Sequence, residues 1–145
     1  MQPANQNELQ NQIETRLRTV RILWFALFTS VGFYYLLTIF QNRREDQNPN
    51  NVLFIALVVV ALVITFVSFV IKEQFVRRAA EQQQPALLQQ GYIVAWAFNE
   101  VPGLMGLFVF FATGTRYYFA LFIISTCGQL LNFPRRSQVE SAYFK

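Results

Sequence analysis

The chain has 145 residues, of which 54% are hydrophobic and only 14% are charged, and its formal net charge is +4. Because a soluble domain usually carries about a quarter charged residues, this composition argues against a soluble protein, and the length allows one domain at most. Histidine is absent and cysteine occurs once, which argues against histidine-ligated zinc or haem, histidine-based catalysis and a disulfide framework. We therefore expect no metal and no cofactor.

The first 21 residues form a polar segment with an apolar stripe. Four apolar residues recur in it at helical spacing: Leu9, Ile13, Leu17 and Val20. This pattern predicts an amphipathic helix, which either lies in the membrane interface or extends the first membrane span into the cytoplasm. A docking helix for a partner protein is the alternative. The apolar run that follows lacks a small-x-small cleavage pattern, so we expect no cleavable signal.

Four apolar runs follow, and they carry almost no charge. A bilayer core of about 30 Å is crossed by roughly 20 helical residues, and lipid offers no partners for backbone N–H and C=O groups, so each span must be a helix. The runs lack the alternation that a membrane barrel needs. The sequence thus predicts an all-α integral membrane four-helix bundle over residues 22–134. The predicted spans are residues 22–40, 52–71, 91–112 and 117–133, of which the last is short.

Positive charge predicts the orientation of these spans, because Lys and Arg gather on the cytoplasmic side. Three Lys or Arg residues lie in the N-terminal segment, three in the connection at residues 72–90 and three in the tail at residues 135–145, against three on the other side. We therefore expect both termini in the cytoplasm (N-in/C-in) and anionic lipid headgroups as partners. The expected location is the bacterial inner membrane or an equivalent energy-transducing membrane.

The connections give further predictions. Residues 41–51 are rich in Asn, Asp and Pro and predict a plain turn. Ala79 and Ala80 favour helix, so the second span is expected to continue beyond the membrane until Pro85 ends or kinks it. A shift of 71 positions aligns five identical residues of the first and third runs. This faint repeat raises the possibility of two tandem helical hairpins, an arrangement known in membrane transporters.

Glu100 is the one charged residue in the third run and lies near its middle. A charge at the bilayer centre costs about 3 kcal/mol on insertion scales, and a carboxyl group avoids much of this cost by taking up a proton. The adjacent Asn99 adds an amide, and Pro102 removes the backbone hydrogen bond to the carbonyl of Phe98. The resulting oxygen-rich spot predicts ion binding by Glu100 and Asn99.

Small residues beside this spot predict close helix packing. Pro102, Gly103 and Gly106 follow Glu100, and glycines on one stripe let another helix approach closely. Three polar residues of the fourth run are candidate hydrogen-bond partners of Glu100: Ser125, Thr126 and Gln129. Three roles stay open for Glu100, namely a clamp between helices or subunits, proton or ion handling, and ligand or lipid binding.

Two groups of residues carry a resemblance to a known family. They are Arg77, Arg78, Gln84 and Pro85 in the connection, and Glu100, Pro102, Gly106 and Leu107 in the third run. Through them residues 52–112 resemble the proteolipid (c) subunit of rotary ATP synthases, a hairpin of two transmembrane helices with a polar cytoplasmic loop and an essential carboxylate midway along its second helix. The resemblance implies that Glu100 carries a proton or sodium ion.

The function expected from these observations is that of a structural or accessory subunit of a membrane assembly. Its partners would be other membrane subunits or further copies of the chain, bound through the face of Gly103 and Gly106. The alternative is proteolipid-like proton or sodium handling through Glu100. The sequence contains no nucleophile–base pair, phosphate loop or nucleic-acid motif, so we expect neither enzyme activity nor a nucleic-acid partner.

Overall fold

The computed structural model describes residues 4–41, 51–113 and 115–143, so the predicted turn at residues 41–51 lies almost wholly outside the described residues. The described residues are mostly helical, and none of them forms a strand. Its elements are α1 (Ala4–Phe40), α2 (Asn51–Gln82), α3 (Pro85–Thr113), the 3-10 turn η1 (Arg116–Tyr118), α4 (Phe119–Leu131) and the short α5 (Arg136–Ser141). The predicted all-α class is confirmed.

Three of these helices, α1, α2 and α3, are long and apolar enough to cross a membrane. The fourth predicted span, at residues 117–133, is a shorter helix. With 13 residues, α4 is about 20 Å long, which is less than the roughly 30 Å of a bilayer core. It ends at Leu131, where the backbone and side-chain amides of Asn132 both donate to the Gly128 carbonyl and Pro134 follows shortly after.

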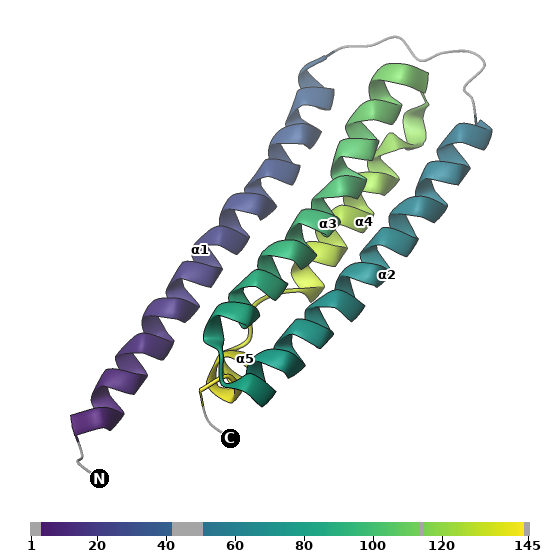
Figure 1. Ribbon diagram of the computed structural model, residues 1–145. Helices are drawn as coiled ribbons and strands as arrows, with labels where there is room; N and C mark the ends of the chain where they lie inside the picture. The colour runs from purple at the N-terminus through teal and green to yellow at the C-terminus, as the bar shows by residue number, and fades with distance from the viewer. Residues whose placement is uncertain (1–3, 42–50, 114, 144–145) are drawn as a thin grey trace.

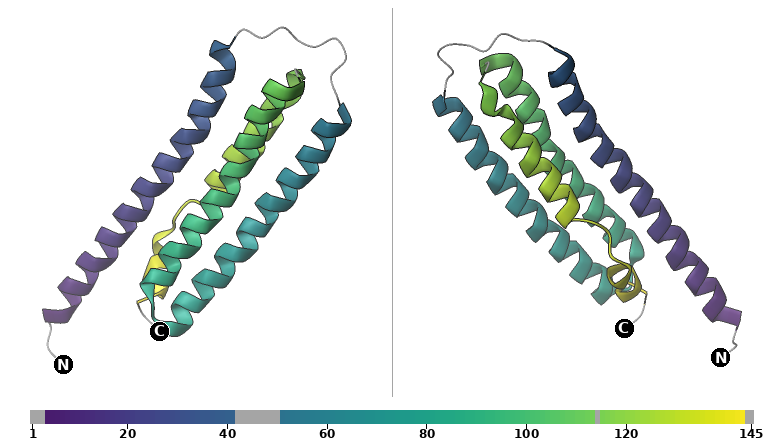
Figure 2. Two further views of the ribbon diagram at one scale, coloured as in Figure 1. Left: turned by 45° about the horizontal axis from the view of Figure 1, so that its top comes forward. Right: turned by 180° about the vertical axis from the view of Figure 1, so that it is seen from behind.

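Helix α3 is the centre of the molecule. It contacts α1, α2 and α4, with α1 and α2 on its two sides and α4 behind it (Figures 1 and 2). Helices α1 and α2 lie apart, whereas α3 packs closely against both of its neighbours in sequence, α2 and α4. The structure therefore gives no support to the possibility of two tandem helical hairpins. Both termini and the α2–α3 turn lie at one end of the molecule (Figure 1).

The α2–α3 turn shows how the Gln-rich connection folds. Helix α2 continues to Gln82, as the alanines predict, and Gln83 then adopts a φ of 50°. The N–H of Gln84 donates to the Ala79 carbonyl at 3.1 Å, which is the bond pattern of a Schellman motif. Pro85 neither ends nor kinks α2; it is the first residue of α3, where its missing N–H costs nothing.

Replacing Gln83 with glycine is expected to stabilise the chain by about 1 kcal/mol. A residue with a side chain pays about that much in the left-handed region, whereas glycine does not. The measurement is the unfolding midpoint of the purified protein in detergent. Gln84→Gly is the matched control, because Gln84 is not among the described residues with positive φ. Equal stabilisation by both variants would contradict the explanation.

The N-terminal segment is part of α1, a continuous helix of 37 residues that is about 55 Å long. Its apolar stripe does not face outward. Ile13, Leu17 and Val20 are buried in one cluster with Val139 and Ala142 from the C-terminal tail. The structure therefore favours the extension of the first span over the docking helix, since the chain's own α5 and α3 already cover the stripe.

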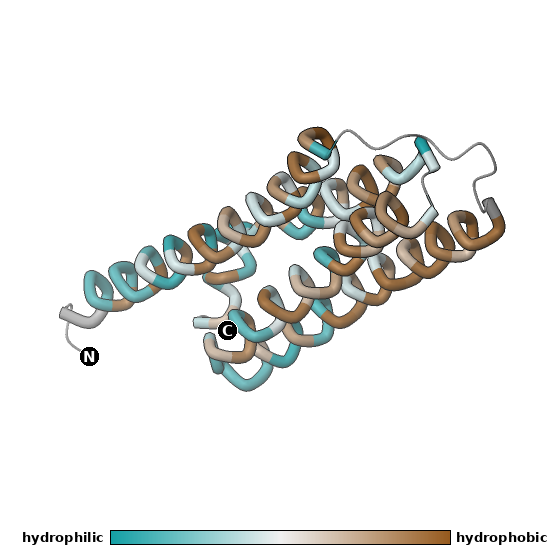
Figure 3. The backbone as a smooth tube through the Cα atoms, turned by 90° about the horizontal axis from the view of Figure 1, so that it is seen from above, coloured by the Kyte–Doolittle hydropathy of each residue, from teal (hydrophilic) through white to brown (hydrophobic). Residues whose placement is uncertain are grey.

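The outer faces of the long helices are apolar. Phe66 on α2 is 68% exposed and Phe40 on α1 is 83% exposed, and many other large apolar side chains of these helices are exposed as well. Figure 3 shows the hydrophilic residues concentrated toward the end that carries the termini. Patches of this extent are exceptional on soluble proteins and mark surfaces that meet lipid or another protein.

Candidate functional site

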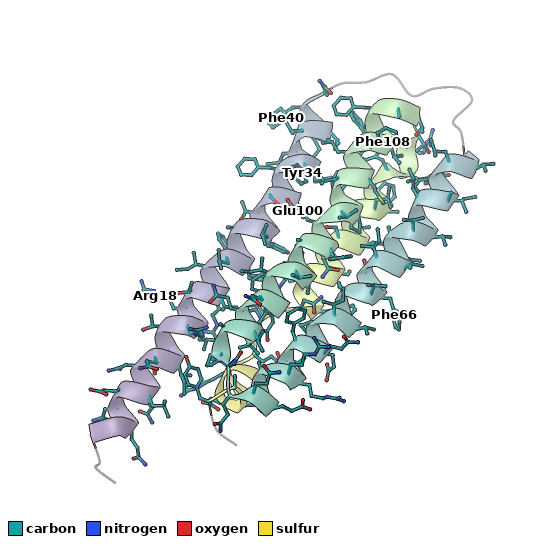
Figure 4. The ribbon with its side chains drawn as sticks, in the orientation of Figure 1. Arg18, Tyr34, Phe40, Phe66, Glu100 and Phe108 are labelled. Atoms are coloured by element: carbon teal, nitrogen blue, oxygen red, sulfur yellow. The ribbon has the colours of Figure 1, made fainter. Side chains whose placement is uncertain are left out.

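Glu100 lies midway along α3 and turns its carboxylate toward α1 (Figure 4). The Ser30 hydroxyl donates to Glu100 Oε1 at 2.6 Å, and the Tyr34 hydroxyl donates to the same oxygen at 2.8 Å. Ser30 and Tyr34 are four residues apart, so they lie on one face of α1. Two hydroxyl groups of one helix thus hold the carboxylate of another.

Two of the three predicted partners of Glu100 on the fourth run, Ser125 and Gln129, bond elsewhere. Ser125 Oγ donates to the Asn99 carbonyl at 2.6 Å, and Gln129 Nε2 donates to the Trp96 carbonyl at 3.1 Å. Thr126 lines a groove between α1 and α4. Ser125 and Gln129 are therefore not the partners of Glu100 that they could have been, because neighbouring helical residues point about 100° apart. Helix α4 packs on the side of α3 that presents Asn99, which turns Glu100 toward α1.

Asn99 is fully buried and joins three helices. Its Oδ1 accepts from the Ser68 hydroxyl of α2 at 3.0 Å, and its Nδ2 donates to the Gly128 carbonyl of α4 at 3.2 Å. The side chains of Asn99 and Glu100 therefore diverge, and the structure does not bring them together into the predicted single ion site. Asn99 bonds α2 and α4, while Glu100 bonds α1.

The glycine face of α3 is a packing surface inside the chain. A Cβ on Gly103 would lie 3.3 Å from Ser125 Oγ and 3.5 Å from Val31 Cγ1, and one on Gly106 would lie 3.1 Å from the ring of Phe122. Pro102, Gly103 and Gly106 are all buried, so their predicted role in helix packing fits the structure. Since α4 and α1 cover them, this face is not available to another subunit, and the expected assembly contact there is wrong.

Two tryptophans, Trp24 of α1 and Trp96 of α3, donate hydrogen bonds to the end of α4, and these bonds were not predicted from the sequence. Trp96 Nε1 donates to the Asn132 carbonyl at 3.0 Å, and Trp24 Nε1 donates to the Gln129 carbonyl at 2.9 Å. The last carbonyls of a helix lack partners within the helix, and a buried indole N–H needs an acceptor. A buried indole N–H and a carbonyl at the end of a helix can satisfy each other, and this pairing is the signal that the sequence offered for these two bonds.

The Glu100 site has a feature that bears on proton chemistry. Ser30 Oγ lies 2.7 Å from the Leu27 carbonyl and 2.6 Å from Glu100 Oε1, but a hydroxyl has one hydrogen to donate. If the carboxylate is charged, the Ser30 hydroxyl can donate to only one of these two acceptors at a time. A protonated Glu100 could instead donate to Ser30, which would then donate to Leu27, while Tyr34 still donates to the carboxyl group. The geometry accommodates both protonation states.

Comparison of the chain with protein-family models, with curated proteins and with solved structures found no match. The function is therefore argued from the geometry of the chain itself.

Proposed function

We propose that the protein is a small multi-pass membrane protein that acts as a structural or accessory subunit of a membrane assembly. The observation that carries this proposal is that the polar side chains of α3 form hydrogen bonds to the chain's other helices. The Glu100 carboxylate is held by two hydroxyls of α1, and Asn99 is held between α2 and α4. Polar side chains within apolar helices are expensive unless they bond one another, and here they bond the chain's own helices.

The proposal includes four membrane crossings with both termini in the cytoplasm. In support of it, α4 runs back from η1 toward the end of the molecule that holds the N-terminus, and the connection to α5 covers the remaining distance (Figure 2). That same end carries basic residues from separate parts of the chain, including Arg18, Arg78 and Arg136, as expected for a cytoplasmic side. Partner subunits or a second copy would meet the exposed apolar faces of the long helices, since the glycine face is covered.

Replacing Glu100 with glutamine tests the structural role. The amide oxygen of Gln can still accept from Ser30 and Tyr34, so the free energy of unfolding in detergent is expected to change by less than about 0.6 kcal/mol, an average hydrogen bond in a membrane. Glu100→Leu removes both bonds and is expected to cost about 1–2 kcal/mol. Proton and sodium flux through liposomes should be the same for wild type and Glu100→Gln.

The second candidate is proteolipid-like proton or sodium handling through Glu100. The observation that favours it is the Ser30 hydroxyl, which is placed to serve either a charged or a protonated carboxyl group. Against it, residues 52–71 contain no glycine, whereas the first helix of the c subunit is rich in alternating glycines, and α1 precedes the similar segment and bonds its carboxylate.

Carbodiimide labelling separates the two candidates, because this reagent modifies protonated carboxyl groups in apolar surroundings. The exposed Glu73 on α2 is the internal control. Selective labelling of Glu100 near neutral pH that is slowed by sodium, together with loss of flux in Glu100→Gln, would replace the structural proposal by the ion-handling one. Unchanged flux and equal, unselective labelling of both carboxyl groups would eliminate ion handling.

A further inference from the structure

One face of α1 carries a stripe that changes character along the helix. Its members are Arg18, Arg21, Phe25, Phe28, Gly32 and Tyr35, which alternate between spacings of three and four. Such spacing keeps residues on one side of a helix. The stripe is basic at the end near the termini, where Figure 4 labels Arg18, and apolar beyond it.

The basic half of the stripe opens into a cavity of about 690 Å³ between α1 and α5. Three arginines line it, namely Arg18 and Arg21 from α1 and Arg136 from α5, against the single carboxylate of Glu14. Arg136 also bonds Glu140, with 2.8 Å between Nε and Oε1. The cavity therefore has a net positive lining, and the planar guanidinium group matches the oxygens of a phosphate.

The apolar half of the stripe forms one wall of a groove of about 340 Å³ between α1 and α4. Phe28, Gly32 and Tyr35 line it from α1, and Phe119 and Ile123 face them from α4. A Cβ on Gly32 would meet no described atom within 4 Å. The groove is therefore open at Gly32.

The cavity and the groove are adjoining parts of the same face. Phe25 lines the cavity and Phe28 lines the groove, one helical turn further on. Eleven residues separate Arg21 from Gly32, which corresponds to about 16 Å along the helix. Half of a bilayer core is about 15 Å thick, so the distance from Arg21 in the cavity to Gly32 in the groove matches the length of one leaflet's acyl chain.

We propose that this face of α1 binds one anionic glycerophospholipid, with its phosphate at Arg18, Arg21 and Arg136 and an acyl chain in the α1–α4 groove. This inference rests on the proposed function, in which the chain lies in a membrane that contains such lipids. Charge complementarity selects an anionic headgroup over a zwitterionic one. Arg77 on α2 provides the contrast, because it is paired with Glu81 and does not line the cavity.

The test is native mass spectrometry of the full-length protein, released from nanodiscs that contain equal amounts of phosphatidylglycerol and phosphatidylcholine. Wild type is expected to retain one phosphatidylglycerol per chain in at least about fivefold excess over phosphatidylcholine. Arg18→Gln/Arg21→Gln should lose this preference and retain the two lipids in about equal amounts. Arg77→Gln/Arg78→Gln removes the same charge outside the cavity and should keep it. No preference in wild type, or an equal loss in both double variants, would overturn the proposal.

The groove is tested separately by Gly32→Phe, which fills the open space and leaves the arginines in place. It should lower the retained phosphatidylglycerol at least threefold. Retention that is unaffected by Gly32→Phe but fully displaced by glycerol phosphate would show a site for free phosphate and overturn the lipid proposal. Each variant is first matched to wild type in membrane extraction by carbonate and in its unfolding midpoint. Extraction of wild type by carbonate would instead refute the proposed membrane function.

Discussion

Gly128→Ala is expected to destabilise the folded chain by about 2–4 kcal/mol. The added Cβ would lie 2.5 Å from Asn99 Oδ1 and 2.9 Å from Asn99 Cγ, with Thr65 Cγ2 at 3.1 Å on another side. Asn99 cannot turn away freely, since it is fully buried and bonded to Ser68 and to Gly128 itself. Overpacking costs about 1–3 kcal/mol, and the two hydrogen bonds that it breaks add about 0.6 kcal/mol each.

The measurement is the free energy of unfolding in detergent, and Gly32→Ala is the matched control. Gly32 also lies within a long helix, but its added methyl group would meet no described atom within 4 Å, so little change is expected. The clash with Asn99 is isolated by a double-mutant cycle. Gly128→Ala combined with Asn99→Ala should cost less than the sum of the single variants, and simple additivity would contradict the packing argument.

The location of the site could be predicted from the sequence, whereas its orientation could not. Glu100 stands out because a charge in an apolar run is rare. The direction of each side chain depends on which face of α3 each helix covers. The partners Ser30 and Tyr34 are 70 and 66 residues away in sequence, and both belong to a helix that no connection joins to α3.

For the fold too, the sequence predicts the features that depend on local properties and not those that depend on contacts between distant segments. Long uncharged apolar runs predict the membrane helices, and Ala79 and Ala80 predict the extension of α2, because these are local properties of the chain. The sequence could not predict that Val139 covers the apolar stripe of Ile13, Leu17 and Val20, since α5 has only six residues, too few for a recognisable apolar period. Pro85 was ambiguous for a local reason as well. The same ring that ends one helix is well placed in the first turn of the next.

Trp96→Ala is expected to cost about 3–5 kcal/mol of unfolding free energy, as is typical for removing a buried tryptophan. Trp96 is fully buried, stacks on Tyr92 with 5.3 Å between ring centroids, and donates to the Asn132 carbonyl. It also belongs to the cluster that joins Leu17 of α1 to Val139 of α5. Removing the ring takes away packing from three parts of the chain and leaves a helix-end carbonyl without its donor.

Phe108→Ala provides the comparison on the same helix, because Phe108 is 56% exposed (Figure 4) and its loss should cost under about 1 kcal/mol. Trp96→Phe retains most of the packing but not the N–H group, so its cost should lie between the two. Limited proteolysis supplies a second measurement. Since α5 packs onto this cluster, Trp96→Ala should speed cleavage near Val139, whereas Phe108→Ala should not. Equal protection of the tail in both variants would show that α5 is held by something other than this cluster, and the cavity between α1 and α5 would then not depend on Trp96.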